Sequence, residues 1–306
     1  MALVLAMIGF GATAAGAGSS APAGATGQLR VAQIGYRLAV RNAATCARTS
    51  AVHGLLLHDL GAYSAENRAA VQRTYGLGDG MGVLAIVAGA PANRAGLAPG
   101  DEIIALNDMP VTRLPLPPLT RAAAYDRVEA FQTLLADGLT QGAVTLTVRR
   151  GAERRIVSLP LERGCAALVT MVPGEKPGAW SDRRYAAVTE GLVRAAGDDE
   201  LAFALAHEMA HVILGHAAEP HGPLTEIGIG GKRSRDRERA ADQLGMAMAV
   251  KAGFDPAGAE ALLKRLAQAS GPAISLTHPS LRSRIEALRA SAKSLESDPH
   301  GTDHPQ

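Results

Sequence analysis

The chain has 306 residues, of which 47% are hydrophobic and 20% are charged, and its formal net charge is +2. This composition excludes an intrinsically disordered chain, and no uninterrupted apolar run is long enough to cross a bilayer, so we expect no integral membrane span. The small net charge gives no support to a nucleic-acid partner, and we interpret the basic run at residues 232–239 as a solvated face. The length predicts about two domains.

The N-terminus has the pattern of a secretory signal peptide. Residues 1–10 are apolar, and the Gly/Ala-rich stretch that follows contains the cleavage-type sites Ala12-Thr13-Ala14 and Ala15-Gly16-Ala17, although no basic residue precedes the apolar core. We therefore expect residues 1–27 to be a signal peptide and low-complexity leader, and the protein to be secreted or periplasmic. The alternative is an unstructured leader of a cytosolic protein.

The chain contains two cysteines, Cys46 and Cys165. Thiols in an oxidising compartment tend to pair, so export would favour a disulfide between them. The alternative is two separate buried thiols, because the sequence does not show whether the Cα atoms come within bonding distance.

The first half of the chain changes character near Tyr75. Residues 28–74 form an N-terminal segment with loose helical spacing at 28–46 and a candidate strand at 53–60. The following part is rich in strands, which we expect at residues 83–87, 101–107, 144–148 and 155–161, with helices at 90–96 and 121–136. These elements predict a compact strand-rich unit.

One part of this unit has a distinctive sequence, Ala88-Gly-Ala-Pro91 followed by Ala95-Gly-Leu-Ala-Pro-Gly-Asp-Glu-Ile-Ile-Ala-Leu-Asn107. It resembles the permuted PDZ domains attached to bacterial envelope proteases. The resemblance implies a PDZ-like domain over residues 75–163, in which a peptide adds to the sheet edge and a glycine loop holds its C-terminal carboxylate. That loop would consist of Tyr75, Gly76, Leu77 and Gly78. In the alternative, the domain only packs against the rest of the chain.

Beyond Cys165 the sequence predicts a hairpin at residues 179–189 and helices at 198–217, 235–252, 256–268 and 280–295, before a polar tail at 296–306. The first helix is apolar nearly all round except at His207, Glu208, His211 and His216. Burying such groups would cost several kcal/mol without a partner, and His207 and His211 leave the same helix face. Both imidazoles can therefore bind one tetrahedral zinc ion, and Glu208 lies beside it, where a base for water belongs.

A later helix carries Glu238-Arg-Ala-Ala-Asp242, with both carboxylates on one face. Together with the H-E-x-x-H string this pattern resembles the gluzincin metallopeptidases of the HtpX and CAAX-prenyl-protease kind, over residues 165–295. The resemblance implies one Zn²⁺ per chain, held by His207, His211 and Glu238, with Glu208 as catalytic base. It also implies that Asp242 orients one ligand histidine, and we expect that partner to be His207.

Two further histidines lie near this motif. The metzincin pattern would require glycine and histidine where the chain has Leu214 and Ala217, so His216 is not expected to bind the metal and is interpreted as a helix-terminal histidine favoured by the dipole. His221 lies in a loop rich in Gly and Pro and is expected to be exposed. A further hypothesis is that His221 occupies the open zinc position in a resting state.

The segment containing His278 and Arg284 resembles the late His-Pro segment of the same family, where a histidine and an arginine face the metal cleft. The resemblance implies that both residues are catalytic and stabilise the oxyanion. The alternative is a helix-capping segment whose Arg284 pairs with a surface carboxylate.

The sequence thus predicts an α+β fold, with a small β-rich PDZ-type domain followed by a mainly helical zincin metallopeptidase domain at residues 164–295 that contains a small β-hairpin. We expect a zinc metalloendopeptidase that cleaves unfolded or loop segments of polypeptide substrates, with the strand at 185–188 pairing with extended substrate. The resemblance implies a role in envelope protein quality control. The alternative is a PDZ-type peptide-binding or chaperone-like protein with a silent zinc site.

Overall fold

The computed structural model describes residues 23–118, 122–216, 231–270 and 280–297. The predicted cleavage region, His221, His278 and residues 298–306 lie outside this description. The fold mixes helix and sheet and divides into two compact units, the first comprising residues 1–36 and 50–163 and the second residues 37–49 and 164–306. Among the described residues, no helix combines the length and apolar character needed to cross a membrane.

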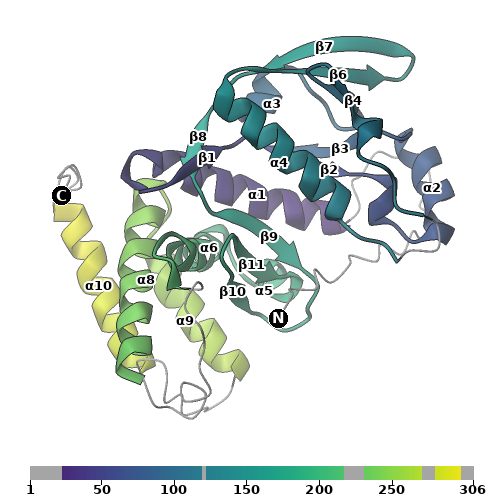
Figure 1. The fold of residues 1–306 in the computed structure, drawn as a ribbon. Helices are drawn as coiled ribbons and strands as arrows, with labels where there is room; N and C mark the ends of the chain where they lie inside the picture. Colours follow the sequence, from purple (N-terminus) through teal and green to yellow (C-terminus); the bar gives the residue numbers. More distant parts are fainter. Residues whose placement is uncertain (1–22, 119–121, 217–230, 271–279, 298–306) are drawn as a thin grey trace. The chain divides into compact units, whose positions relative to one another are not determined.

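The first unit is built on an antiparallel sheet with the strand order β2-β3-β4-β6-β7 and with β5 added to β4 (Figure 1). The strands are β2 (Leu55–His58), β3 (Met81–Ile86), β4 (Glu102–Leu106), β5 (Met109–Pro110), β6 (Val144–Arg150) and β7 (Glu153–Leu159). Alternate residues of β6 are buried, as expected of a strand with one face on a core. The paired strands predicted around residue 151 are therefore present.

Helices α1 (Ala23–Arg41), α2 (Ala65–Tyr75), α3 (Pro91–Arg94) and α4 (Asp126–Gln141) occur in the first half of the chain. Helix α4 covers one face of the sheet, where Phe131, Leu135 and Leu139 are fully buried in the same core as the strands (Figure 1). The helix continues past the predicted end at residue 136 because Leu139 extends its buried face. It ends at Gly142, whose φ of 147° is not helical.

Residues 50–74 are part of this unit and not a separate segment. Strand β2 pairs with β3, and Val71 of α2 packs in one cluster with Leu60 and Leu77. The sheet therefore begins before residue 75, where the sequence placed the start of the strand-rich unit. Helix α2 was not predicted, because its sequence is mostly polar and shows no apolar face; only Arg68 and Val71 are buried.

The second unit contains a three-stranded sheet in the order β10-β11-β9 and a group of helices. Its elements are β9 (Leu168–Val172), β10 (Ala179–Ser181), β11 (Tyr185–Thr189), α5 (Glu190–Ala195), α6 (Asp198–Ile213), α8 (Gly231–Lys251), α9 (Ala257–Ser270) and α10 (Leu281–Ser297). The predicted hairpin is present as β10 and β11, and Asp182 Oδ1 closes its turn by accepting from the backbone N–H groups of Arg184 and Tyr185. Helix α6 contacts the sheet, α8 and α9 and is therefore central (Figure 1).

The remaining described elements are short: strands β1 (Thr49–Ala51) and β8 (Arg163–Cys165) and the 3-10 helices η1 (Ala43–Thr45), η2 (Leu60–Ala62) and η3 (Val111–Arg113).

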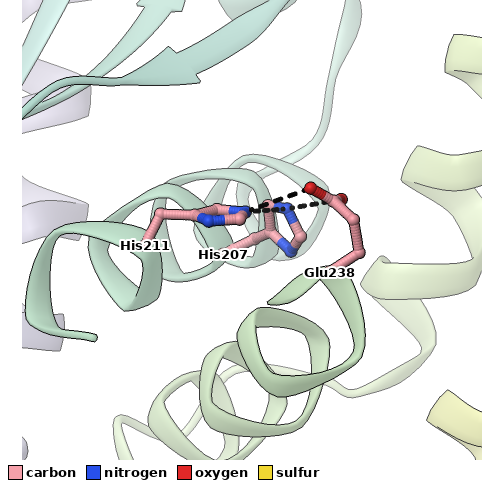
Figure 2. Close-up of side chains that lie close together, drawn as sticks. All are labelled: His207, His211 and Glu238. Atoms are coloured by element: carbon pink, nitrogen blue, oxygen red, sulfur yellow. Dashed lines mark hydrogen bonds and ion pairs between the residues drawn. The ribbon is translucent and has the colours of Figure 1, made fainter. Parts of the chain in front are cut away.

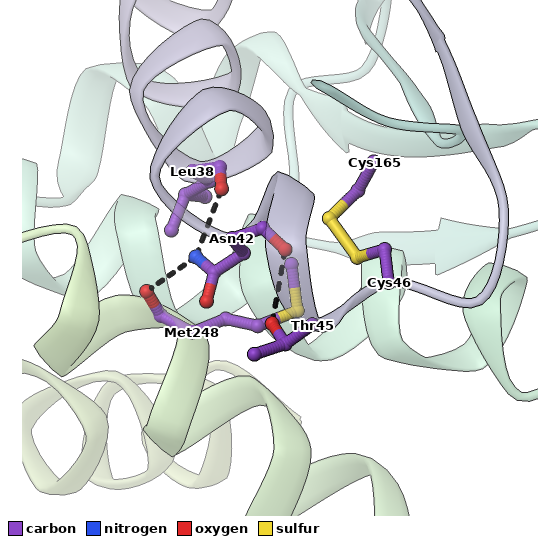
Figure 3. The surroundings of a disulfide bond; sticks show 6 residues. All are labelled: Leu38, Asn42, Thr45, Cys46, Cys165 and Met248. Carbon is purple, nitrogen blue, oxygen red and sulfur yellow. Dashed lines mark hydrogen bonds between the residues drawn. A yellow bond between two sulfur atoms is a disulfide. The ribbon is translucent and has the colours of Figure 1, made fainter. Parts of the chain in front are cut away.

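A disulfide lies within the second unit. Cys46 and Cys165 are bonded, with their Cα atoms 5.5 Å apart, which confirms the predicted pairing (Figure 3). Nearby, the side-chain amide of Asn42 donates to the carbonyl oxygens of Leu38 at 2.9 Å and Met248 at 3.1 Å. Residues 37–49 are thus held to the C-terminal part of the chain by a covalent bond and a buried hydrogen bond.

Candidate metal centre

Helix α6 holds the polar residues of the candidate site on an otherwise apolar helix. Its first turn is acidic, which suits the positive end of the helix dipole, and Glu200 Oε2 accepts from the backbone N–H of Gly197 at 2.7 Å. The apolar side chains between Leu201 and Val212 are all buried. The helix is therefore fixed at the centre of its unit, and the polar groups of its second half are held in a buried position.

Helix α8 approaches α6 closely because it carries a glycine at the contact. A Cβ atom at Gly245 would lie 2.9 Å from the backbone nitrogen of His207, so no larger residue fits without a shift. Glu238 lies two turns earlier on the same helix face as Gly245. The close approach thereby brings the Glu238 carboxylate to the histidines of α6.

Three side chains converge between these helices. His207 Nε2 lies 3.2 Å from His211 Nε2 and 3.6 Å from Glu238 Oε2, and His211 Nε2 lies 3.5 Å from Glu238 Oε1 (Figure 2). One ligand atom from each residue fits within a group whose members are all within 4.8 Å of one another. The structure thus brings together the three predicted zinc ligands.

The donor set and the charge of this cluster both fit a divalent cation. Ligand atoms at about 2.0–2.1 Å from a tetrahedral zinc ion are about 3.3–3.4 Å apart, close to the separations seen here. The carboxylates of Glu208, Glu238 and Asp242 lie among these groups, and the guanidinium of Arg284 balances only part of their charge. A bound dication would neutralise the remainder.

Asp242 and Arg284 form a hydrogen-bonded pair behind His207. Asp242 Oδ1 lies 3.0 Å from His207 Nδ1, on the side of the ring away from Nε2. Arg284 donates to both carboxylate oxygens of Asp242, from Nε at 2.9 Å and from Nη2 at 2.6 Å. The Asp242 side chain therefore lies beside the histidine that the sequence analysis expected it to orient.

The pKa values of the two histidines are shifted in opposite directions. Burial alone would lower the pKa of His207, but hydrogen bonding to Asp242 and Glu238 outweighs burial and raises it to about 9. Burial and the neighbouring His207 lower the pKa of His211 to about 4. The carboxylates thus stabilise positive charge at His207, and metal binding would have to displace that proton.

Glu208, the predicted general base, is buried beside His207. It follows His207 directly on α6 and is 9% exposed. Burial raises the pKa of its carboxyl, whereas the charge of His207 and a hydrogen bond from the Ser181 hydroxyl act in the opposite direction. Ser181 is on β10, which contacts α6, so the sheet reaches the side of the helix that carries Glu208.

His216 contacts the other ligand histidine. Its Nδ1 lies 2.9 Å from Nδ1 of His211, and the two ring centroids are 5.0 Å apart. Burial lowers the pKa of His216, and the charge of Arg237 lowers it further. His216 is therefore beside the site without facing the point where the three ligand atoms meet.

The comparison with known families bears directly on this site. Residues 166–222 and 223–292 match peptidase family M48, a family of zinc metallopeptidases. The chain is a metallopeptidase. It is thus a hydrolase that acts on peptide bonds, and the matched part contains the whole cluster described above.

One solved structure that matches is the crystal structure of the HtrA3 PDZ domain bound to a phage-derived ligand (FGRWV). It is 18% identical over 38% of this chain and 89% of that chain, with a TM-score of 0.27. No protein of curated function matches the chain.

The predicted peptide-binding loop is next to the carboxylate of Glu102. The backbone N–H groups of Gly78 and Gly80 donate to Glu102 Oε1 at 2.9 and 2.7 Å, and Arg149 Nε donates to Glu102 Oε2 at 2.8 Å. The loop also leads into β3, which is paired on both sides, by β2 and β4. An internal carboxylate thus accepts from the Gly78 N–H, one of the backbone groups that were expected to hold a peptide terminus.

The other residues of that loop have structural contacts. Tyr75 ends α2 and packs edge-on against His58, with ring centroids 5.0 Å apart. Gly76 adopts a φ of 62° as the C-cap of α2, and Leu77 is buried. The glycines that suggested a binding loop are therefore explained by the end of a helix and a tight entry into β3.

Ser181 was not among the predicted site residues, and the strand predicted to pair with substrate, at 185–188, is not an edge strand. Strand β11 lies between β10 and β9, so both of its edges are paired and it has no free edge for a substrate. Strand β10 is the edge strand next to it. The hairpin sequence alone does not show which strand lies at the edge, because the order is decided by the preceding strand β9, which pairs in parallel with β11.

Proposed function

We propose that this metallopeptidase is a zinc-dependent endopeptidase that cleaves extended, unfolded or loop segments of polypeptides. The observation that carries the proposal is the convergence of one ligand atom each from His207, His211 and Glu238 beside the buried Glu208. Two imidazoles and one carboxylate are a common ligand set of catalytic zinc, which leaves a coordination position open.

Each ligand would be held in a defined way. His207 and His211 would bind through Nε2, and Glu238 through a carboxylate oxygen. Asp242 would keep the His207 ring in the correct orientation by accepting from Nδ1, and Arg284 would keep Asp242 charged and in place. A structural zinc site, by contrast, would be expected to fill all its positions with protein ligands and would have no use for Glu208.

The chemistry of the chain itself centres on Glu208. Bound zinc would supply Lewis acidity toward the substrate carbonyl and the attacking water. The ionised Glu208 carboxylate accepts a proton from the water as its oxygen attacks the peptide carbonyl carbon. Glu208 then donates this proton to the amide nitrogen as the C–N bond breaks, which releases an amine and a carboxylic acid.

We propose strand β10 as the binding site for the substrate backbone. It is the edge strand of the three-stranded sheet, it contacts α6, and its Ser181 donates to Glu208. An extended peptide can add to such an edge through main-chain hydrogen bonds, whereas a folded segment has its own backbone groups paired. This geometry favours unfolded or loop substrates.

The two residues predicted to stabilise the oxyanion are Arg284 and His278, and the structure describes only Arg284. Arg284 is engaged by Asp242, so its contribution to the reaction would pass through that carboxylate. His278 lies outside the described residues, and its role beside the oxyanion stays a proposal based on the family resemblance.

We further propose that the strand-rich unit is a PDZ-type domain that binds extended peptides. The sheet has edge strands at β2 and β7, either of which offers a backbone for strand addition. The domain division proposed from the sequence, with a PDZ-like part at 75–163 and a peptidase part at 164–295, needs the strand at Leu55–His58 added to the first part.

An extracytoplasmic location and a role in envelope protein quality control complete the proposal. The disulfide between Cys46 and Cys165 supports an oxidising compartment, because such bonds are rare in reducing cytosol. The leader at residues 1–27 is consistent with export but rests on its sequence alone.

A cleavage assay tests the proposed function. Purified protein is incubated with casein alone, with a chelator, and with chelator followed by excess zinc. We expect cleavage at internal bonds, its loss on chelation and its return with zinc. Absence of cleavage under every metal condition, with zinc bound, would favour the alternative of a peptide-binding protein with a silent zinc site.

A further inference from the structure

The contact between His211 and His216 lies on the side of His211 away from the proposed metal position. His211 points Nε2 toward His207 and Glu238, at 3.2 and 3.5 Å, and points Nδ1 toward Nδ1 of His216 at 2.9 Å. The two nitrogens are on opposite edges of the imidazole. A single ring can therefore use one nitrogen for the metal and the other for His216.

A glycine turn places His216 there. Helix α6 ends at Ile213, Leu214 still has helical backbone angles, and Gly215 has a φ of 71°. This left-handed conformation reverses the chain at a helix end and is accessible to glycine at little cost. The residue after it is thereby turned back over the last turn of the helix, where His211 lies.

The protonation of the pair follows from the ligand role. An imidazole that binds a metal through Nε2 carries its hydrogen on Nδ1, so His211 must be the donor in the contact. His216 must then accept through an unprotonated Nδ1 and carry its own hydrogen on Nε2. The contact thus requires one particular tautomer of each ring.

We propose that His216 is a positioning residue that accepts a hydrogen bond from His211 Nδ1 and so orients His211 for the metal. It would do for His211 what Asp242 does for His207, with a neutral imidazole in place of a carboxylate. The inference rests on the proposed zinc site. It gives the Gly215-His216 turn a function beyond ending the helix.

Zinc binding by matched variants tests this inference in the full-length protein. His216→Phe keeps a ring of similar size but removes the acceptor, whereas His216→Asn can present its Oδ1 near the position of the imidazole Nδ1. Leu214→Ala, in the same turn and 43% exposed, is the control. Zinc affinity is measured by competition with a chelator, and the metal-free proteins are compared by thermal melting.

We expect His216→Phe to bind zinc roughly 10–100-fold more weakly, as is typical when a partner of a metal-bound histidine is lost. His216→Asn and Leu214→Ala should stay within about threefold of wild type, a change of less than 1 kcal/mol. Wild-type affinity in a folded His216→Phe protein would overturn the inference.

A measurement on the wild type covers the case in which His216→Phe fails to fold. In zinc-loaded protein labelled with ¹⁵N, the hydrogen bond predicts a slowly exchanging His211 Nδ1–H proton with scalar coupling to His216 Nδ1. An uncoupled, rapidly exchanging proton would contradict it.

If the wild type bound no zinc, the proposed function would fail together with this inference. Normal zinc binding and cleavage with unchanged affinity in His216→Phe would remove only the inference.

Discussion

Arg284 keeps the buried Asp242 carboxylate ionised. Burial alone would raise the pKa of Asp242, but hydrogen bonds from His207 and Arg284 outweigh it and lower the pKa. The bidentate geometry of the guanidinium suits a carboxylate that must stay ionised. The sequence left two alternatives for Arg284, a catalytic role or a pair with a surface carboxylate. A buried pair with Asp242 could not be predicted, because the two residues are 42 positions apart.

Glu238→Ala tests whether Glu238 is the third zinc ligand. The variant loses the proposed third ligand, so we expect zinc affinity to fall by at least about a hundredfold and thermal stability in zinc to fall with it. Zinc content is measured by elemental analysis after dialysis. Glu286→Ala, an exposed carboxylate on α10, is the control and should retain zinc. Full zinc occupancy in Glu238→Ala would move the third ligand elsewhere.

At the scale of elements, the spacing of His207 and His211 could be predicted because both lie on one helix, whose period fixes their common face. Glu238 could be predicted as a ligand only from the family resemblance, because its position next to the histidines depends on the packing of α6 against α8 at Gly245. The order of the small sheet could not be read from sequence at all. It depends on β9, which skips the next strand along the chain, β10, and pairs in parallel with β11.

Ser181→Ala tests the contact between β10 and the proposed base. The Ser181 hydroxyl lowers the pKa of Glu208, against the effect of burial. A general base must be ionised. Loss of this donor raises the pKa of Glu208, so the acidic limb of the pH profile of kcat/KM should move to higher pH, and activity at neutral pH should fall by roughly tenfold. Ser158→Ala, an exposed serine on β7, provides the control. An unshifted acidic limb in Ser181→Ala would mean that the hydroxyl does not act on the base.

Strand β2 carries a buried histidine that should make stability depend on pH. Burial lowers the pKa of His58 to about 4, and its Nδ1 lies 2.8 Å from the Tyr63 hydroxyl. The unfolded chain, with a histidine pKa of about 6.5, binds the proton first, so stability falls as pH decreases from about 6.5 to about 4. The stability lost over this interval is about 3 kcal/mol.

Denaturant unfolding at several pH values measures this dependence. The wild type should lose stability over that interval, and His58→Asn, which cannot be protonated there, should show a shallower slope whatever its stability at neutral pH. An equal slope in the two proteins would place the pH dependence elsewhere.

At the scale of the whole molecule, the sequence predicted a fold that mixes helix and sheet, and the described elements do so. The residues of the peptide loop predicted at 75–78 have contacts within the chain itself. Glycines mark positions that need special backbone angles, and here Gly76 serves a helix C-cap while Gly78 meets Glu102. A glycine pattern alone does not distinguish an external carboxylate from one supplied by the chain itself.

The disulfide should contribute measurably to the stability of the second unit. Cys46 and Cys165 are 119 positions apart, and a bond that closes a loop of this size removes about 4–5 kcal/mol of chain entropy from the unfolded state in the simple model. We expect the double variant Cys46→Ser, Cys165→Ser to lose roughly 2–4 kcal/mol, measured by denaturant unfolding. Addition of a reductant should lower the midpoint of the wild type but not of the double variant.

The account as a whole depends on Glu208 acting as the base of a zinc-dependent peptidase. Glu208→Gln removes the base but leaves the ligands His207, His211 and Glu238 intact. The decisive measurement is casein cleavage and zinc content on the same preparation of this variant. We predict wild-type zinc content with proteolysis reduced by at least about a hundredfold. Turnover within about tenfold of the wild type, with zinc bound, would contradict the account.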